Sequence, residues 1–210
     1  MGAHARIGNV LEQPKAGKVY AANANSARIV DVFNLATEAE IVAGLNWYNE
    51  AQELAAKISP KDPKMGAGVI AALSPMMPWD RNMMLAEQAF TDGKASGALF
   101  GNVAKANRIM AGENPLDVLG GDKVRNFYLA IAEPATSEAV CIDRHAFDIA
   151  VGRVTNNESR AVLKNKGVYE SFAKAYVRAA KVASKALGQA VTPSQMQAIT
   201  WTTWRRLKGL

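Results

Sequence analysis

A chain of 210 residues, 49% of them hydrophobic, can bury one core or two closely packed lobes, which excludes disorder of the whole chain. The only cysteine, Cys141, excludes an internal disulfide and any zinc or iron–sulfur site built from several thiolates of this chain. Lysine and arginine total 25 against 19 aspartates and glutamates, and the resulting net charge of +6 is compatible with a polyanionic partner.

Targeting and membrane signals are absent from the sequence. No run reaches the roughly 18 to 20 apolar residues of a membrane span, and residues 1–30 lack the apolar block of a signal peptide. A single cysteine suits a reducing compartment. We therefore expect a cytoplasmic protein without a membrane partner.

The N-terminal half divides into an arm and a series of helices. Residues 1–30 show no sustained period, which predicts a loosely ordered arm before a single helical domain over residues 31–210. Thr37 opens the sequence TEAE, a capping box followed by apolar residues at helical spacing, and two prolines after Ile58 stop that helix. A second helix through MGAGVIAALS breaks at Ser74-Pro75 and resumes near Pro78.

The C-terminal half continues in the same way. Short helices are expected around residues 103–110, 124–131 and 147–151, and one long helix is expected over residues 159–187. Thr192 opens TPSQ, a second capping box with proline at the first helical position, which begins the last helix. No segment alternates with period two long enough to form a sheet, so the predicted class is all-α.

The long C-terminal run carries a row of cations. Lys174, Arg178, Lys181 and Lys185 share one side, away from the apolar residues of the same run. Such a row is either an ordinary solvated helix face or, together with Arg205, Arg206 and Lys208, a contact to phosphates.

Two stretches resemble a known family. GDKVRNFYLAIAE…CIDRHAFDIAVGR and, before it, VIAALSPMMPWDRNMMLAEQAF are similar in order and spacing to motifs of the helix-hairpin-helix DNA glycosylase superfamily, in particular its endonuclease III-like members. The resemblance covers roughly residues 66–155. It also extends to small phage-encoded members associated with thymine hypermodification.

This resemblance implies a helical bundle of two closely packed lobes, with a helix-hairpin-helix core over residues 66–155 and C-terminal helices over 159–210. It implies a monomer that acts on double-stranded DNA, without a cofactor, metal or iron–sulfur cluster. The catalytic residues it implies are Asp143 and Lys123. The DNA-binding residues it implies are Gly121, Arg125, Asn126, Arg144, His145, Ser74, Trp79 and Asn82.

The chemistry that the resemblance implies is cleavage of the bond between base and sugar. That reaction builds positive charge on the sugar ring, which the carboxylate of Asp143 would stabilise. A lysine such as Lys123 can attack the sugar and form a Schiff base, giving lyase activity as well. The target base must leave the stack, and Met76, Met77 or Trp79 is placed to line a pocket or to wedge the duplex.

Departures from the family pattern leave two alternatives open. The segment DVLGGDKVRN has one fewer recognisable hairpin glycine than the family, the glutamine of the earlier helix pair is replaced around Pro75–Met77, and the four-cysteine loop is absent. One alternative is an enzyme that modifies a pyrimidine, such as a hypermodified thymine, on the same fold. The other is a DNA-binding protein without catalysis.

Each candidate residue also has a purely structural interpretation. Aspartate is a favoured residue at a helix start, so Asp143 is also explained as a helix cap, and Lys123 as a solvated surface lysine. His145 has only His4 as a second histidine, so we interpret it as a positioning or DNA-contact residue and not as a metal ligand. We interpret Trp79, Trp201 and Trp204 as core residues more readily than as platforms for bases.

Overall fold

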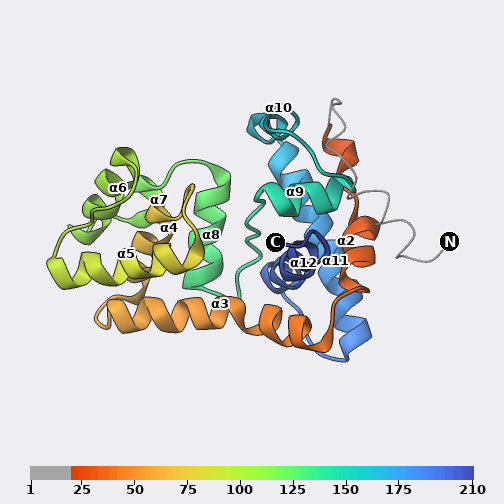
Figure 1. The fold of residues 1–210 in the computed structure, drawn as a ribbon, viewed down its shortest axis with the longest axis horizontal. Helices are drawn as coiled ribbons and strands as arrows, with labels where there is room; N and C mark the ends of the chain where they lie inside the picture. Colours follow the sequence, from red (N-terminus) through yellow and green to blue (C-terminus); the bar gives the residue numbers. More distant parts are fainter. Residues whose placement is uncertain (1–19) are drawn as a thin grey trace. The chain divides into compact units, whose positions relative to one another are not determined.

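The computed structural model describes residues 20–210, and every regular element in that range is a helix, which confirms the all-α class. The chain divides into two compact units (Figure 1). We call residues 48–137 the inserted unit. The described part of the other unit, residues 20–47 with 138–210, we call the terminal unit.

The division falls at other places than the expected core of residues 66–155. The first boundary follows Trp47, within the helix α3 (Glu38–Ile58), and the second follows Ser137. The C-terminal helices thus share a unit with the N-terminal ones. Hydrophobic periodicity reports which face of a helix is buried but not which other helix covers it, so this pairing has no signal in the sequence.

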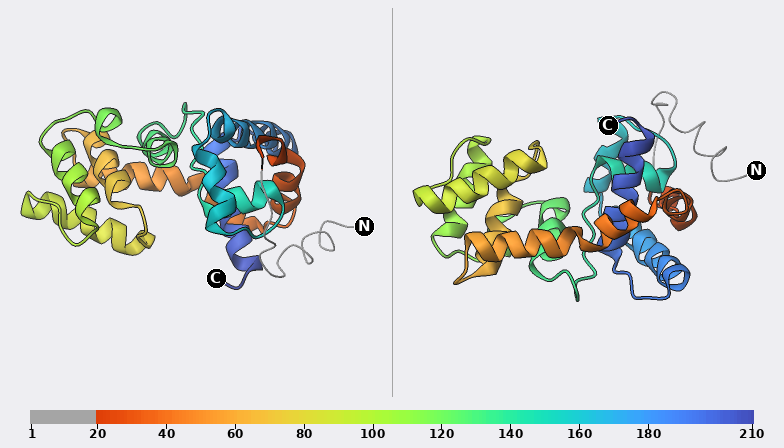
Figure 2. Two further views of the ribbon diagram at one scale, coloured as in Figure 1. Left: turned by 90° about the horizontal axis from the view of Figure 1, so that it is seen from above. Right: turned by 60° about the horizontal axis from the view of Figure 1, so that its bottom comes forward.

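The terminal unit is built around two long helices, α11 (Val168–Leu187) and α12 (Pro193–Leu207). They pack against each other and against α2 (Ser26–Phe33) and α9 (Arg144–Val151), as Figures 1 and 2 show. The remaining helical segments of this unit are η1 (Ala21–Asn23), α10 (Asn157–Arg160) and η2 (Ala161–Lys164). Phe147 of α9 stacks on Phe172 of α11 with 4.7 Å between the ring centroids, in the centre of the core.

The end of the expected N-terminal arm is ordered. Asn25 caps α2 by accepting a hydrogen bond from the Ala27 amide, and Ile29 is fully buried in the core. Three apolar residues are enough to hold a short helix in place when they pack against the core formed by other helices. They are too few to give a recognisable helical period in the sequence. Residues 1–19, the rest of the expected arm, lie outside the described residues.

Both predicted capping boxes are present. The Thr37 amide donates to Glu40 and the Glu40 amide donates to the Thr37 hydroxyl at the start of α3, and Thr192 and Gln195 exchange the same two bonds at the start of α12. Gln195 also donates to the carbonyl of Leu45, which fastens α12 to the first half of α3. The local signals therefore set both the start of α12 and its docking.

The expected single helix over residues 159–187 is interrupted. Asn165 is extended at φ −77° and ψ 142°, and Gly167 lies at φ 78°, so α11 begins only at Val168. A positive φ is readily adopted by glycine and costs other residues free energy, which makes the Asn-Lys-Gly segment a natural break. Apolar residues on both sides of the break keep helical spacing, which explains why the period alone runs through it.

The inserted unit is arranged around α4 (Pro63–Leu73), in which every residue from Gly66 to Leu73 is buried. It packs against the other helices of this unit: α5 (Trp79–Asp92), α6 (Phe100–Met110), α7 (Pro115–Val118) and α8 (Asp122–Ala132). A Cβ at Gly66 would lie 2.3 Å from the Ala55 carbonyl oxygen of α3, so glycine is required for that approach. None of the described helices has the length and apolar character needed to cross a membrane.

Candidate functional site

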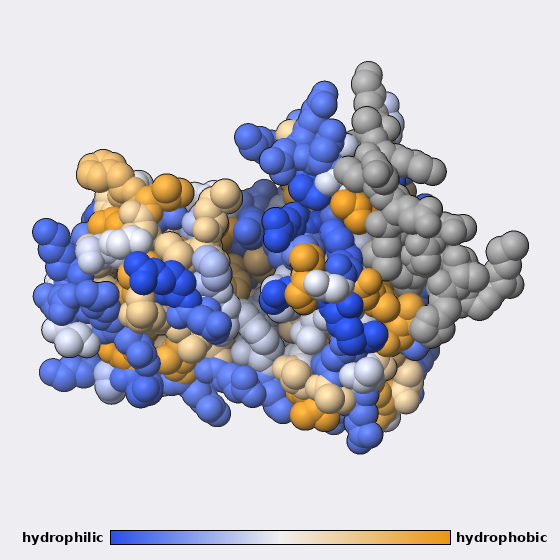
Figure 3. Space-filling view, in the orientation of Figure 1, coloured by the Kyte–Doolittle hydropathy of each residue, from blue (hydrophilic) through white to orange (hydrophobic). Residues whose placement is uncertain are grey.

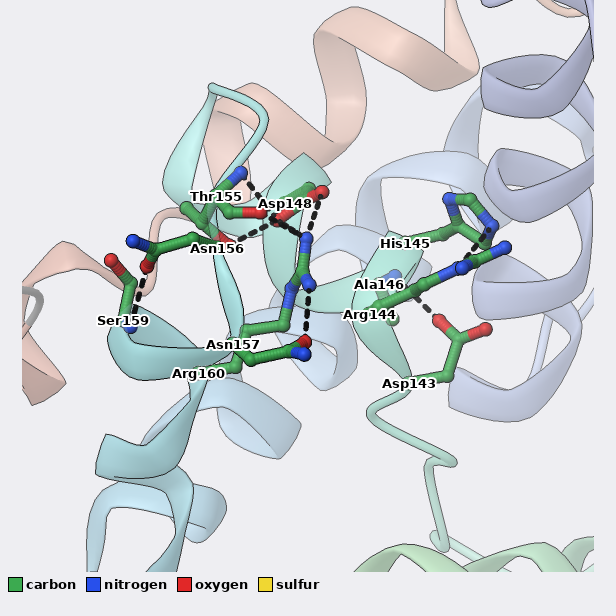
Figure 4. A network of polar contacts seen from close by, with 10 residues as sticks. All are labelled: Asp143, Arg144, His145, Ala146, Asp148, Thr155, Asn156, Asn157, Ser159 and Arg160. Atoms are coloured by element: carbon green, nitrogen blue, oxygen red, sulfur yellow. Dashed lines mark hydrogen bonds and ion pairs between the residues drawn. The ribbon is translucent and has the colours of Figure 1, made fainter. Parts of the chain in front are cut away.

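The most organised polar cluster in the terminal unit surrounds Asp143 at the start of α9 (Figure 4). One carboxylate oxygen, Oδ1, accepts a hydrogen bond from the Ala146 amide at 2.7 Å as a helix cap. The other, Oδ2, accepts one from the Trp201 indole Nε1 at 3.0 Å. Each oxygen keeps a further lone pair, so the carboxylate is fixed in orientation and still able to interact with a ligand.

Two buried tyrosines hold the backbone on either side of Asp143. The Tyr169 hydroxyl donates to the Val140 carbonyl at 2.8 Å and accepts from the Ile142 amide at 3.0 Å. The Tyr176 hydroxyl donates to the Ala146 carbonyl at 3.0 Å. Because α11 supplies both tyrosines, the position of Asp143 is set by the core and not by a mobile loop.

Cationic side chains flank this carboxylate. Arg144 follows it directly in the chain and is exposed. The Arg205 guanidinium lies over the Trp201 ring, 4.7 Å from its centroid, in cation–π geometry. Arg205 lies in the last turn of α12 and Lys208 directly follows this helix. Figure 3 shows hydrophilic side chains interspersed with hydrophobic ones over this face of the protein. The surroundings of Asp143 therefore attract anions.

His145 lies beneath this surface, with 5% of its area exposed. Burial lowers the pKa of its imidazole from 6.5 to about 4; the charge of Asp143 opposes this shift, and the charges of Arg144, Lys208 and Arg205 add to it. The Arg144 Nε donates to His145 Nε2 at 3.2 Å, so the proton of the neutral ring is on Nδ1. That nitrogen is buried and has no hydrogen-bond partner among residues 20–210.

The cluster can act chemically through charge. A negative carboxylate of fixed geometry can stabilise a developing positive charge, and cations beside it can hold anionic groups on a polymer. Within the described residues, no three histidine, cysteine, aspartate or glutamate side chains gather in a way that could hold a metal ion.

Lys123 belongs to the inserted unit, whereas Asp143 belongs to the terminal unit. Lys123 occupies the first turn of α8 and its side chain is exposed, so its ammonium group stays hydrated. The desolvation that activates a lysine nucleophile is therefore not supplied by this helix.

Three of the expected DNA ligands lie at the start of α8: Gly121 precedes this helix, and Arg125 and Asn126 belong to it. Gly121 caps α8 at φ 78°, which requires glycine. Arg125 donates through Nε to the Leu119 carbonyl at 3.0 Å, and the Asn126 side chain donates to the Asp122 carbonyl at 2.8 Å. Arg125 therefore stabilises the turn that connects α7 with α8, and Asn126 bonds within the first turns of α8.

Three more of the expected DNA ligands lie where α4 connects to α5: Ser74 directly follows α4, and Trp79 and Asn82 belong to the start of α5. The Ser74 hydroxyl donates to the Ala71 carbonyl at 2.9 Å, and Trp79 packs edge-on against Phe127 of α8 with centroids 6.3 Å apart. Asn82 is 1% exposed and donates to the carbonyl of Ile70 at 3.1 Å. Burial removes this side chain from the surface, so it serves the packing of α5 on α4 and not the expected DNA contact.

A second polar cluster lies at the other end of α9 and has a structural role (Figure 4). Asp148 is 1% exposed and pairs with Arg160 at 3.1 Å, while the Thr155 amide donates to the same carboxylate at 3.1 Å. Burial raises the pKa of Asp148, although Thr155 and Arg160 oppose the shift. These bonds fasten the segment after α9 to the core.

Three residues of the Asp143 site were missed by reasoning from the sequence: Trp201, Arg205 and Lys208. Trp201 was interpreted as a core residue, and Arg205 and Lys208 only as members of a diffuse basic surface. Trp201 is 58 residues from Asp143, and the contact depends on how α12 packs against α9. Only the spacing of Trp201 and Arg205, one helical turn apart, is visible in the sequence.

Comparisons with known proteins give a family without an assigned activity. No curated protein and no solved structure matches the chain significantly. One family model matches residues 13–208, nearly the whole chain, and its description is a family of unknown function, DUF7178. The chain therefore belongs to the DUF7178 family.

Proposed function

We propose that this protein acts on bases in duplex DNA in the manner of a glycosylase, cleaving the bond between base and sugar with Asp143 as the stabilising carboxylate. The observation that supports the proposal best is the geometry of Asp143, whose two oxygens are held by the Ala146 amide and the Trp201 indole. The resemblance of the segments around Asp143 and Lys123 to helix-hairpin-helix glycosylases gives the reaction class.

The reaction that fits this site is hydrolysis. The bond between C1′ and the base nitrogen breaks, a water molecule adds its hydroxyl group to C1′, and its proton goes to the departing base. The sugar ring becomes positively charged as the bond breaks, and a carboxylate that cannot rotate away stabilises that charge without reorganisation. Arg144, Arg205 and Lys208 would hold the flanking phosphates.

In this proposal Lys123 contacts phosphate and does not attack the sugar. Its exposed position in the first turn of α8 leaves the side chain free to reach a phosphate, and this helix provides no buried pocket that would hold it against a sugar carbon. Borohydride treatment of the protein on a duplex with an abasic site should therefore give no covalent adduct. An adduct that disappears in Lys123→Ala would restore the lyase interpretation.

An exposed hydrophobic residue supports entry into a duplex. Met76, in the turn between α4 and α5, is 91% exposed and has φ 63°, a backbone conformation that costs non-glycine residues about 1 to 3 kcal/mol. Strained exposed residues occur at functional sites, where the strain fixes a side chain in place. An exposed side chain held in this way could enter the base stack of a duplex and replace part of the stacking at the step that it opens.

The test is base release from a panel of duplexes containing uracil, mismatched thymine or hydroxymethyluracil, measured by mass spectrometry of the free base. Asp143→Asn should lower the rate by about 100-fold or more, because it removes the charge that stabilises the sugar, and should change duplex affinity by no more than about twofold. Asparagine is also a good helix cap, so the fold should be kept.

Asp62→Asn is the matched control. Asp62 caps α4 by accepting from the Met65 amide, so the same change of cap is made away from the proposed site. Equal rates for Asp143→Asn and wild type, or no base released by wild type from any duplex, would refute the proposal. Turnover confined to the hydroxymethylated duplex, with the base retained on the sugar, would favour the pyrimidine-modifying alternative.

The second candidate is a DNA-binding protein without catalysis, and one observation favours it. Both oxygens of Asp143 already accept hydrogen bonds from its own unit, so capping α9 and holding α12 account for the whole carboxylate without a ligand. On this account Asp143→Asn lowers stability and leaves every duplex intact, as wild type does. Salt-dependent binding without product would support it.

A further inference from the structure

One face of α11 carries four cations and no other function in the fold. Lys174, Arg178, Lys181 and Lys185 are all exposed, and at about 100° per residue they lie within about 60° of one another around the helix. We call these four residues the basic face. The buried residues of α11, among them Phe172, Tyr176 and Ala183, point in the opposite direction, into the core.

The basic face is not explained by the stability of the helix. Across residues 20–210, none of its four cations forms an ion pair with a carboxylate, and the only acidic residue of α11 is Glu170 in the first turn. Like charges three and four residues apart repel each other along the helix. The helix dipole favours a cation in the last turn, which accounts for Lys185 but not for the other three.

The charge of the whole chain is concentrated in the same unit. Residues 138–210 contain 12 lysines and arginines and 5 aspartates and glutamates, whereas residues 48–137 contain 9 and 10. The positive charge of the chain therefore comes from the segment that carries α9, α11 and α12. The charge of the inserted unit is nearly balanced, whereas the C-terminal segment is strongly positive. This uneven distribution indicates a binding site for a polyanion on the C-terminal segment.

The chemistry of this surface selects among polyanions. Protein interfaces have an apolar or aromatic centre, and single-stranded nucleic acids require aromatic rings for stacking, whereas the exposed face of α11 carries no aromatic residue. A helix that binds a lipid surface inserts its apolar side, and that side of α11 is buried in the core. Val182 is the one large hydrophobic side chain that α11 exposes beside these cations, which is too little for a protein or lipid interface. A line of cations with so little apolar surface fits a line of phosphates on a duplex.

We propose that the basic face of α11 binds the phosphate backbone of duplex DNA, as a contact additional to the one at Asp143. Over the 11 steps from Lys174 to Lys185 the helix rises about 16 Å, and a duplex carries one charge per about 1.7 Å of its axis, so each cation has a phosphate within reach. The choice of duplex DNA as the polyanion rests on the proposed function. That the ligand is a polyanion rests only on the four exposed cations of α11.

The test is the salt dependence of duplex binding by the full chain. Each phosphate contact contributes about 0.9 to the slope of log K against log salt. Changing all four cations to glutamine should reduce the slope by about 3.6 and lower the affinity by about two to three orders of magnitude at about 0.15 M salt. Glutamine has nearly the helix propensity of lysine, so the thermal unfolding midpoint should not fall.

The matched comparison uses two double variants with equal loss of charge. Lys174→Gln with Lys181→Gln should reduce the slope by about 1.8, whereas Lys61→Gln with Lys94→Gln, at exposed lysines of the inserted unit, should leave it nearly unchanged. Equal losses in the two double variants, or stronger retention of anionic lipid vesicles or single strands than of duplex, would overturn the proposal.

Base release separates this proposal from the preceding one. If wild type releases no base but the four-fold variant loses duplex binding, the basic face stands and the glycosylase reaction fails. If wild type releases a base and the four-fold variant binds duplex like the Lys61 and Lys94 control, the reaction stands and the basic face fails.

Discussion

The stability of the terminal unit should fall as His145 becomes protonated in the unfolded chain. The folded pKa of about 4 lies below the ordinary value of 6.5, because the buried imidazole is costly to charge. Above pH 6.5 the ring is neutral in both states and its contribution to stability is complete. Below pH 6.5 the unfolded chain takes up a proton that the folded chain does not, so the free energy of unfolding falls.

The size of this effect follows from the two pKa values. The loss should reach about 2 kcal/mol near pH 5 and level off at about 3 kcal/mol below pH 4, because one pKa unit corresponds to about 1.4 kcal/mol. The value is large for one side chain because His145 is 5% exposed and water cannot solvate the cation.

The assay is urea unfolding of wild type and His145→Gln at several values between about pH 8 and pH 5. Glutamine does not titrate, so the difference between the two proteins isolates the imidazole; His4 and the buried Asp148, whose pKa is raised, are common to both and cancel. The difference should shrink by about 2 kcal/mol from pH 8 to pH 5. A difference that stays constant over this range would refute the account of His145 as a buried neutral ring.

Two further predictions concern packing and the second polar cluster. In Gly44→Ala the new Cβ would lie 2.5 Å from the Ile199 amide nitrogen, so α3 and α12 must separate and the free energy of unfolding should fall by about 1 to 3 kcal/mol. In Gly101→Ala, within the helix α6, the new Cβ meets nothing within 4 Å, so the free energy of unfolding should rise by about 0.5 to 1 kcal/mol. Arg160→Met should cost about 3 to 5 kcal/mol, because it leaves the Asp148 carboxylate buried without its cation. Thermal or urea unfolding checks both, and neutral results for Gly44→Ala or Arg160→Met would show that these contacts are weaker than their geometry implies.

The parts of the fold that sequence reasoning predicted are the ones set by local chemistry. Thr37 and Thr192 mark helix starts because the side chain and the residue three positions later satisfy each other's free amide groups. The break at Ser74-Pro75 was predicted from the proline, and α4 does end at Leu73, although Ser74 itself keeps a helical backbone at φ −66° and ψ −29°. Such signals act over one helical turn, so a single sequence contains them completely.

The parts that were not predicted depend on contacts distant in the chain. Ile29 was placed in a loose arm, but it is buried because α11 and α12, more than 130 residues later, provide the core against which α2 packs. Two lobes were expected, but their boundaries were not, and these have the same origin, since the chain leaves the terminal unit within α3 and returns to it after Ser137. Local patterns determine where helices form, and tertiary packing determines which of them meet.

Asp143 shows why this distinction matters for function. A cap needs one acceptor oxygen for the first turn of α9, and Asn25, Asn114 and Asn156 provide that elsewhere in the chain with an uncharged amide. At Asp143 the second oxygen accepts a hydrogen bond from the indole of Trp201, and the Arg205 guanidinium lies over the ring of that tryptophan. A cap alone needs neither the charge nor the second donor. Trp201→Phe removes that donor together with part of the ring that contacts Arg205 and His145, and it should lower base release more than stability if the carboxylate is oriented for chemistry.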